Sequence, residues 1–323
     1  SGNAAVNVHV YANSVTGAIL DYVRMPSALW LPTPLISDGF GTSFGTTDGQ
    51  GHPETSGLGA GGSGLSWVHN TYSVSGGKAI NTPNVGSELL TNTTFDTDAS
   101  SWTAVNATLT SVAGGQSNNA LEVKSTVASA ATAYGYQQVT TAAGDWVLAV
   151  VYHKNGTQSG SMRLASTSGG TDIKQLTVQS DGSWTRKALS GRAVNTTTFL
   201  RLSVGAGTTN DTTLFDEASV KKITMADLFA SVSTATADVI ADAEFTVPNG
   251  LDAGLVINLD STSSPANFVL AYLDRFAATV YLVKYVAGVP TVVNSGAITY
   301  ASGANIRVAK IGTAYRVYYN NAV

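Results

Sequence analysis

Two phrases decide the fold of this chain: LLTNTTFDTDASSW at residues 89–102 and TLFDEASVKKI at residues 213–223. Between them lie short runs in which apolar and polar residues alternate, separated by clusters of Gly, Ser, Thr and Asn. The runs are ALEVKS from Ala120, YGYQQVTT from Tyr134, DWVLAVVYHK from Asp145 and TFLRLSVGAG from Thr198. Alternation with a period of two between turn clusters is typical of antiparallel strands, so we expect residues 89–223 to form one β-sandwich domain.

The two end phrases also carry a family resemblance. They match an opening Asn-x-x-Phe-Asp/Glu phrase with a Trp after a short gap, and a closing aromatic-Asp-Asp/Glu phrase. The matching residues are Asn92, Phe95, Asp96 and Trp102 in the opening phrase and Phe215, Asp216 and Glu217 in the closing phrase. In these residues the chain resembles the jelly-roll carbohydrate-binding modules of families 4 and 9. The resemblance implies a jelly roll over residues 89–223 and a glycan or polysaccharide as its partner.

The sequence on either side of this domain predicts a second sandwich that is split in two. Residues 36–40 read ISDGF, and residues 65–80 read LSWVHNTYSVSGGKAI. After the jelly roll, strand-like runs follow at regular spacing, among them NFVLAYLD, VYLVKYVAG and IRVAKIGTAYRVYYNN within residues 267–321. These phrases resemble the strands of laminin-G-like, concanavalin-type sandwiches. We therefore expect residues 35–88 and 224–323 to form one sandwich with the jelly roll inserted in a loop, an arrangement that exposed loops tolerate well.

The N-terminal residues 1–34 stand apart from both sandwiches. VNVHVYAN and AILDYVRM read as two strands joined by residues 14–17, which predicts a β-hairpin followed by a Pro-rich connector. A two-stranded hairpin does not hold a core alone, and the laminin-G-like pattern lacks its usual last strands after residue 323. We expect the N-terminal strands to complete such a sandwich, either within the chain or by self-association with a neighbouring copy. The alternative is that they end a preceding unit of a longer repeat polypeptide.

Length and composition agree with this organisation. A chain of 323 residues with 43% hydrophobic residues is long enough for two or three domains with cores. Only 12% of the residues are charged, and the 33 glycines and abundant Ser and Thr are common in extracellular β-proteins and fibres. The expected fold class is all-β with two antiparallel β-sandwiches, and the expected location is extracellular, on a cell surface or on a virion.

Charge and residue usage exclude several kinds of partner and site. The net charge of −4 supplies no basic patch, which argues against nucleic-acid binding. The absence of cysteine excludes disulfides, thiolate metal sites and cysteine nucleophiles. The longest apolar runs, such as WVLAVVY at residues 146–152, are far shorter than the roughly 20 residues of a membrane-spanning helix, so we expect no membrane span.

Catalytic motifs are missing from the sequence. Its four histidines are scattered, and none stands in a HExxH phrase. Neither the Glu-x-Asp-x-x-Glu pattern of concanavalin-type glycosidases nor a Gly-x-Ser-x-Gly elbow occurs, and GLGAGG lacks the Lys of a phosphate loop. The sequence therefore predicts that the chain is not an enzyme.

Aromatic side chains are the candidates for sugar binding, because the apolar face of a pyranose packs on a ring while polar groups bind its hydroxyls. The candidate carbohydrate-binding residues of the jelly roll are Tyr134, Tyr136, Gln138, Trp146, Tyr152 and Trp184, with Trp102, Gln137 and Arg163 considered beside them. For each ring the alternative is packing in a core, since the run at residues 146–152 is apolar on both faces. Tyr134 and Tyr136 share a face with polar Gln138, which favours this pair.

The family resemblance also implies a structural Ca²⁺ that joins the first and last strands of the jelly roll. Asp96 and Asp216 occupy the matching positions as carboxylate ligands. The usual Glu of the opening phrase is replaced by the shorter Asp96 in this sequence.

Three functions remain open at this point. The first is a non-catalytic fibre or adhesin protein, extracellular or virion-associated, with a carbohydrate-binding module. The second is a purely structural subunit of a filament or sheath assembled by β-strand complementation. The third is an accessory region of a polysaccharide-degrading enzyme. Low charge and all-β spacers with Gly-rich connections favour the first two and do not choose between binding and assembly.

Overall fold

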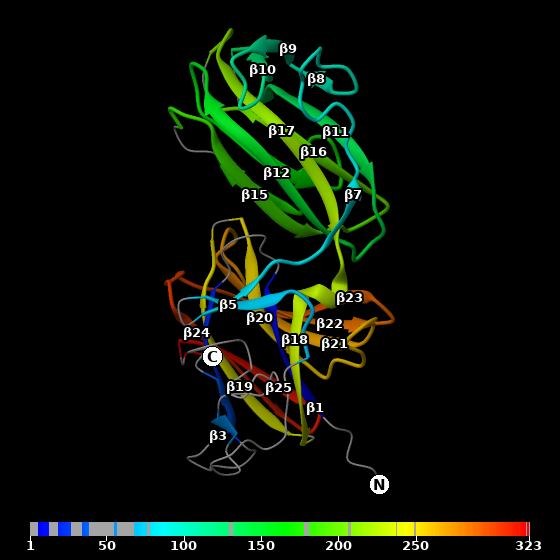
Figure 1. Ribbon diagram of the computed structural model, residues 1–323, viewed down its shortest axis with the longest axis vertical. Helices are drawn as coiled ribbons and strands as arrows, with labels where there is room; N and C mark the ends of the chain where they lie inside the picture. The colour runs from blue at the N-terminus through cyan, green and yellow to red at the C-terminus, as the bar shows by residue number, and fades with distance from the viewer. Residues whose placement is uncertain are drawn as a thin grey trace. The chain divides into compact units, whose positions relative to one another are not determined.

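The structure is a computed structural model of the chain (Figure 1). It describes residues 6–12, 19–26, 34–38, 55–56, 68–75, 78–128, 132–177, 181–205, 208–236, 238–248, 250–320 and 322. Within these ranges side chains are described from residue 68 onward, apart from residues 73–78, 177 and 232–236. Of the laminin-G-like phrases, residues 39–40, 65–67, 76–77 and 321 lie outside the described part of the chain.

The described residues are almost wholly β-structure, which confirms the predicted fold class. They contain no α-helix, and η2 (Met225–Leu228) is a single turn of 3-10 helix. Within the same ranges, no helix has the length and apolar character needed to cross a membrane.

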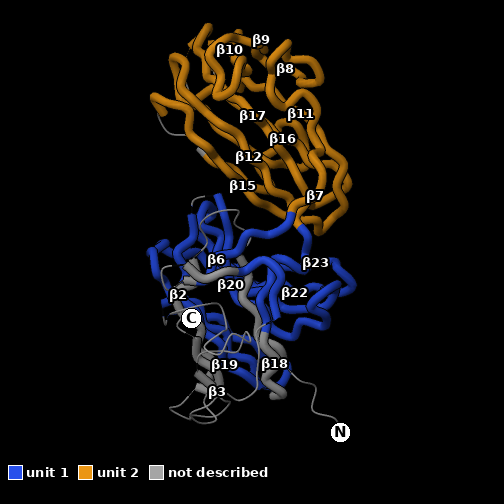
Figure 2. Tube along the Cα trace, in the orientation of Figure 1, with its two compact units in different colours: residues 1–84, 224–323 blue, residues 85–223 orange. Residues whose placement is uncertain are grey.

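The chain divides into two compact units (Figure 2). Unit 1 combines residues 1–84 with residues 224–323, and unit 2 is formed by residues 85–223. The two passages between the units are adjacent, because the backbone N–H of Thr224 donates to the carbonyl oxygen of Asn84 at 3.1 Å. Closely spaced ends are the geometry that allows a complete domain to occupy a loop of another.

Unit 2 is a jelly roll in which the chain alternates between two antiparallel sheets. The five-stranded sheet has the order β14-β13-β16-β11-β8, and the opposing sheet has the order β15-β12-β17-β10-β9, with β7 also paired to β17. The five-stranded sheet contains β8 (Thr103–Val105), β11 (Tyr134–Thr140), β13 (Gly160–Ala165), β14 (Lys174–Thr177) and β16 (Thr197–Val204). The opposing sheet contains β7 (Val85–Glu88), β9 (Ala107–Ala113), β10 (Asn119–Ser125), β12 (Trp146–Asn155), β15 (Thr185–Arg192) and β17 (Thr212–Ile223).

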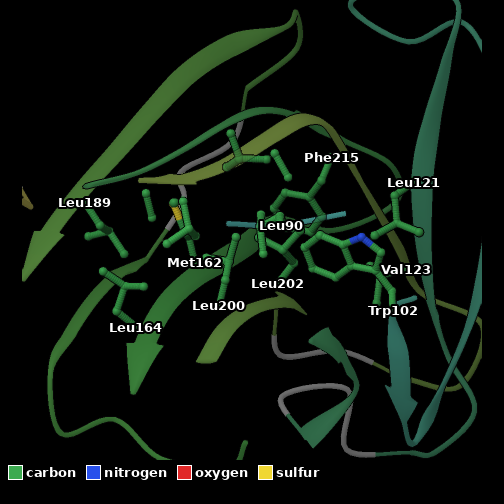
Figure 3. Packing of buried hydrophobic residues seen from close by; sticks show 14 of the residues in the cluster. Leu90, Trp102, Leu121, Val123, Met162, Leu164, Leu189, Leu200, Leu202 and Phe215 are labelled. Atoms are coloured by element: carbon green, nitrogen blue, oxygen red, sulfur yellow. The ribbon is translucent and has the colours of Figure 1, made fainter. Parts of the chain in front are cut away.

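The core of unit 2 is filled from both sheets (Figure 3). Its large members include Met162, Leu164, Leu200 and Leu202 from the five-stranded sheet and Leu121, Val123, Leu189 and Phe215 from the opposing sheet. The opening phrase closes this core, since Phe95 and Trp102 are buried with ring centroids 5.4 Å apart. The indole nitrogen of Trp102 donates to the carbonyl oxygen of Asn92 at 3.1 Å, so Trp102 packs as a core residue.

Unit 1 is a second two-sheet sandwich. Its six-stranded sheet contains β1 (Val6–Ala12), β18 (Phe229–Thr236), β20 (Asp252–Ile257), β21 (Phe268–Asp274), β22 (Thr279–Val286) and β23 (Val289–Ala297). Its eight-stranded sheet contains β2 (Ile19–Pro26), β3 (Pro34–Asp38), β4 (Thr55–Ser56), β5 (Tyr72–Ser75), β6 (Lys78–Asn81), β19 (Val239–Thr246), β24 (Ala304–Ile311) and β25 (Ala314–Tyr319). Phe245, Leu255 and Ile306 are among the fully buried residues between the two sheets.

The predicted N-terminal hairpin is wrong. β1 lies between β18 and β20 with both edges paired, whereas β2 lies in the other sheet and pairs with β19, β3 and β6. Alternation of apolar and polar residues identifies a strand but not its partner, and a central strand has no free edge for its neighbour in sequence. In this structure the N-terminal strands complete the sandwich of unit 1 within the chain.

Candidate functional site

The outer face of the five-stranded sheet carries the favoured tyrosine pair. Tyr134, Tyr136 and Gln138 point outward from β11, because the alternate residue Val139 belongs to the core. The facing pairs on this side are Tyr134–Ser203, Tyr136–Arg201 and Gln138–Phe199 across β11 and β16, and Arg201–Arg163 across β16 and β13. We use the name tyrosine–arginine face for Tyr134, Tyr136, Arg163, Phe199 and Arg201.

Three aromatic rings follow one another across this face. The ring centroids of Tyr134 and Tyr136 are 6.2 Å apart, and those of Tyr136 and Phe199 are 5.7 Å apart. Both separations fall in the range of favourable aromatic pairs. Tyr136 and Phe199 are partly exposed and Gln138 is exposed, so part of this apolar strip is open to solvent beside an amide group.

Arg201 lies against the first ring of the strip. Its guanidinium carbon is 3.7 Å from the centroid of Tyr134, which is a cation–π contact, and its Nε donates to the hydroxyl of Ser203 at 2.8 Å. Burial, with Arg163 as a second cation nearby, lowers the pKa of Arg201 to about 10, so its side chain stays charged at neutral pH. Because Arg201 and Tyr134 are only 5% and 8% exposed, Tyr136 and Phe199 offer the accessible rings.

The loop between β13 and β14 covers the Tyr134 end of the face. The carbonyl oxygen of Gly169 accepts a hydrogen bond from Nη1 of Arg201 at 3.4 Å. Gly169 also lies close to the hydroxyl of Tyr134, since a Cβ on this glycine would be 3.7 Å from that oxygen. The Tyr134 end is therefore built into the fold, and the Tyr136 end faces solvent.

The other predicted aromatic residues lie elsewhere in unit 2. Trp146 and Tyr152 belong to β12 of the opposing sheet, where Trp146 is 3% exposed and Tyr152 is partly buried. Trp184 precedes β15 of the same sheet, and its indole nitrogen donates to the carbonyl oxygen of Gly114 at 3.1 Å. The structure thus separates these three residues from the tyrosine–arginine face.

Sequence reasoning missed Phe199 and Arg201. Both lie in TFLRLSVGAG, where they alternate with Leu200 and Leu202 of the core. This alternation is the signal in the sequence that places Phe199 and Arg201 together on the outer side of the strand. Gln137, considered as a polar partner for sugar, is buried instead. Its amide Oε1 accepts from the backbone N–H of Thr91 at 2.7 Å and its Nε2 donates to the Thr91 carbonyl at 2.9 Å.

The two aspartates of the predicted calcium site hold the turn between β9 and β10. Asp216 Oδ2 accepts from the backbone N–H of Ser117 at 3.0 Å, and Asp96 Oδ1 accepts from that of Asn119 at 3.5 Å. A Cβ on Gly115 would lie 2.7 Å from Asp216 Oδ2, so only glycine lets the turn approach this closely. Burial raises the pKa of Asp216.

This arrangement does not form a complete calcium site. Ca²⁺ takes six to eight oxygen ligands, and Asp216 Oδ1 also accepts an N–H, that of Glu217 at 2.7 Å. Within the described ranges, no three His, Asp or Glu side chains gather in a way that holds a metal ion. A calcium ion at Asp96 and Asp216 would have to draw most of its ligands from carbonyl groups. The calcium site at these two residues stays a prediction.

A buried Thr–His–Asp arrangement lies inside unit 2. His153 Nδ1 is 2.9 Å from Asp181 Oδ2, and its Nε2 is 2.9 Å from the hydroxyl of Thr213. The spacing is that of a nucleophile, a base and an orienting carboxylate. His153 and Thr213 are fully buried, however, so a substrate cannot reach them and the arrangement serves to pair polar groups in the interior.

Unit 1 has an apolar groove between the edge strands β23 and β25. It has a volume of about 540 Å³ and is lined in part by Leu282, Ile298, Tyr315, Val317 and Tyr319. The outer edge of β23 exposes Val289, Val292 and Val293, which are 63%, 50% and 58% exposed. An edge strand with exposed apolar residues is a site at which further strands pair.

Comparison with known proteins gives structural likenesses only. No family model matches the sequence, and no curated protein matches it. The xylan-binding CBM22-1 domain of Paenibacillus barcinonensis Xyn10C is similar to 45% of this chain over 97% of its own length, with 14% identity and a TM-score of 0.34. TmCBM61, solved with β-1,4-galactotriose, is similar to 42% of this chain over 99% of its length, with 15% identity and a TM-score of 0.33.

A larger protein is similar as well. An arabinose-bound α-L-arabinofuranosidase, MgGH51, aligns with 44% of this chain at 15% identity and a TM-score of 0.36. The chain spans 28% of the length of that protein.

Proposed function

We propose that unit 2 is a non-catalytic glycan-binding module whose sugar packs on the tyrosine–arginine face. The observation that carries this proposal is the partly exposed ring pair Tyr136 and Phe199, flanked by the exposed amide of Gln138 and by two guanidinium groups. A pyranose combines an apolar face with a rim of hydroxyls, so a strip of rings beside fixed hydrogen-bond donors complements it.

Fixed side chains favour binding at this face. The partners of Tyr134 and Arg201 come from β11, β16 and the β13–β14 loop, so their positions are set before any ligand arrives. Preorganised side chains lose little conformational freedom on binding, which raises affinity. Aromatic rings held by regular strands thus make a better sugar platform than rings on an unsupported loop.

The module is proposed to belong to an extracellular, cell-surface or virion-associated fibre or adhesin protein. A composition with 12% charged residues and two consecutive β-sandwiches supports this setting. An accessory region of a polysaccharide-degrading enzyme would use the same face, and it requires a catalytic domain in addition to these two units.

A glycan array tests the proposal directly. The full chain is expected to bind a defined set of glycans, and Tyr136→Ala and Phe199→Ala are expected to lose those signals while keeping the near-ultraviolet circular dichroism of folded protein. The proposal would be contradicted if the full chain bound no glycan on the array, or if both variants kept the signals of the wild type.

Assembly through unit 1 is a second candidate function, favoured by the apolar groove and the exposed valines of β23. In this version a second copy of the chain packs against the β23 edge. Sedimentation velocity of the full chain should then show a concentration-dependent oligomer that Val292→Lys abolishes, because a charge at an apolar edge opposes strand pairing. A monomer at all concentrations would rule assembly through this edge out.

A further inference from the structure

Two arginines face each other on the outer side of the five-stranded sheet. Arg163 of β13 and Arg201 of β16 are direct partners in the antiparallel register. Directly opposed side chains in such a pair approach closely, and like charges there destabilise the sheet. An anion that lies between or above the two guanidinium groups would remove this repulsion.

Arg163 also has an unsatisfied hydrogen-bond donor. Its Nε is buried and has no hydrogen-bond partner within the described part of the chain. A buried N–H of a charged group without an acceptor costs free energy, and such a group calls for an explanation, for example an ordered water, a bound ion or a functional role. Burial lowers the pKa of Arg163, a cost that a bound carboxylate would offset.

The unit itself supplies no counter-charge at this place. The five strands of the sheet contain Arg163, Lys174 and Arg201 but neither Asp nor Glu. Asp172, in the loop between β13 and β14, accepts a hydrogen bond from the backbone N–H of Ser166 at 3.0 Å. The undescribed residues of unit 2, at 129–131, 178–180 and 206–207, include no acidic residue in the sequence. Arg163 therefore forms no ion pair among the described residues of its own unit.

We propose that the tyrosine–arginine face is selective for acidic glycans, and that the carboxylate of a uronic or sialic acid residue pairs with Arg163 beside Arg201. The inference rests on the proposed glycan-binding function of unit 2 and names the class of sugar. A guanidinium group matches a carboxylate in two parallel hydrogen bonds, which fixes the orientation of the sugar as well as its charge.

The neighbouring rings complete the site. Tyr136 is the register partner of Arg201 and contacts Phe199. A sugar ring packed on Tyr136 and Phe199 therefore has the guanidinium groups at its edge, where the carboxyl group of a uronic acid projects from the pyranose ring. Gln138, opposite Phe199 on the solvent side, is placed to bind hydroxyl groups.

The first experiment is an array that presents neutral, uronate-containing, sialylated and sulfated glycans to the full chain. Carboxylated glycans are expected to bind most strongly, and their signals should fall as salt is raised. Signals from neutral glycans alone would overturn the inference and leave the proposed function intact. Signals from sulfated glycans alone would also overturn the assignment to carboxylates, and an array without signals would overturn both proposals.

The second experiment is a double-mutant cycle measured by titration calorimetry. The strongest carboxylated glycan is compared with its methyl ester, which keeps the size of the sugar and removes the charge. Esterification is expected to weaken binding to the wild type by about 10- to 100-fold, as for a hydrogen-bonded charge pair. Arg163→Gln should weaken binding of the acid by a similar factor and make acid and ester bind alike.

Arg186→Gln serves as the matched control. Arg186 is an exposed arginine on β15 of the opposing sheet, so its removal changes the net charge equally without touching the proposed site. It should leave the preference for the acid unchanged. The assignment of Arg163 would be overturned if the wild type bound acid and ester with equal affinity. It would also be overturned if Arg163→Gln and Arg186→Gln lost the same affinity for the acid.

Discussion

The two sheets of unit 2 share one core but treat their basic side chains differently. In the opposing sheet, Lys187 Nζ lies 2.9 Å from Asp181 Oδ2 and Lys222 Nζ lies 2.7 Å from Asp145 Oδ2. In the five-stranded sheet, Arg163 faces another arginine and has a buried Nε without an acceptor. Lys187 and Lys222 thus have acidic partners within unit 2, whereas Arg163 lies beside a second arginine and a strip of aromatic rings.

If the proposed function holds, this difference separates residues that serve the fold from residues that serve binding. The inner faces of both sheets contribute fully buried apolar side chains to one core, so stability is expected to depend on both. The outer faces differ in chemistry, so binding is expected to depend on one of them.

The largest effect is expected from the shared core. Leu202→Ala in the five-stranded sheet and Leu189→Ala in the opposing sheet each remove a fully buried leucine side chain. Each substitution should lower the free energy of unfolding by about 2–5 kcal/mol. Urea unfolding followed by circular dichroism measures the free energy of unfolding of both variants. A decrease below about 1 kcal/mol in either variant would show that the two inner faces do not contribute alike to stability.

Two tyrosines on the outer faces provide the next test. Tyr136→Ala should weaken glycan binding by about 1–3 kcal/mol, because it removes an accessible stacking ring. Tyr152→Ala, a partly buried tyrosine of the opposing sheet, should leave affinity unchanged. Titration calorimetry compares the two variants, and a greater loss from Tyr152→Ala would assign binding to the opposing sheet.

Acid should weaken the opposing sheet through His153. Burial lowers the pKa of His153 from 6.5, although Asp181 opposes the effect. As pH falls below 6.5 the unfolded chain takes up this proton before the folded chain does, so the free energy of unfolding decreases by at most about 1.4 kcal/mol per pH unit. The decrease ends once the pH has passed the folded-state pKa.

Urea unfolding between neutral and mildly acidic pH checks this expectation. The variant His153→Gln should show a shallower dependence on pH than the wild type. Burial also lowers the pKa of His69 in unit 1. Its contribution to the pH dependence of stability is the same in the wild type and in the variant, so it cancels when the two are compared. If the free energy of unfolding changed with pH equally in the wild type and in His153→Gln, His153 would not titrate as its buried position requires.

The smallest effect is expected from calcium. If Ca²⁺ binds at Asp96 and Asp216, a concentration equal to its dissociation constant adds about 0.4 kcal/mol to the free energy of unfolding. Thermal unfolding with calcium and with a chelator measures the shift, and Asp216→Asn should remove it. An unfolding temperature that is the same with calcium and with chelator would end the calcium proposal.

Strands and fold class could be predicted from sequence because alternation is a local property. The phrases NFVLAYLD, VYLVKYVAG and IRVAKIGTAYRVYYNN correspond to strands β21, β22, β24 and β25, and NFVLAYLD became β21 (Phe268–Asp274) almost residue for residue. Pairing is not local. The partners of β1 lie more than two hundred residues further along the chain, which no turn signal near residue 14 reveals.

The candidate site was predictable in part for the same reason. The shared face of Tyr134 and Tyr136 follows from the pattern of β11 alone. Arg163 and Arg201 come together only through the register of β13 with β16, and the sequence does not contain that register. Trp146 and Trp184 are large aromatic residues like the tyrosines, and only the three-dimensional structure shows that they lie in or directly before strands of the opposing sheet, away from the site.

The central claim is that a glycan binds the outer face of the five-stranded sheet. Nuclear magnetic resonance of the isotope-labelled full chain, titrated with a glycan identified on the array, tests it most directly. Chemical-shift changes should cluster at Tyr136, Arg163 and Phe199 and leave β12 and β15 unaffected. Changes centred on Tyr152 and Trp184 of the opposing sheet would contradict the account.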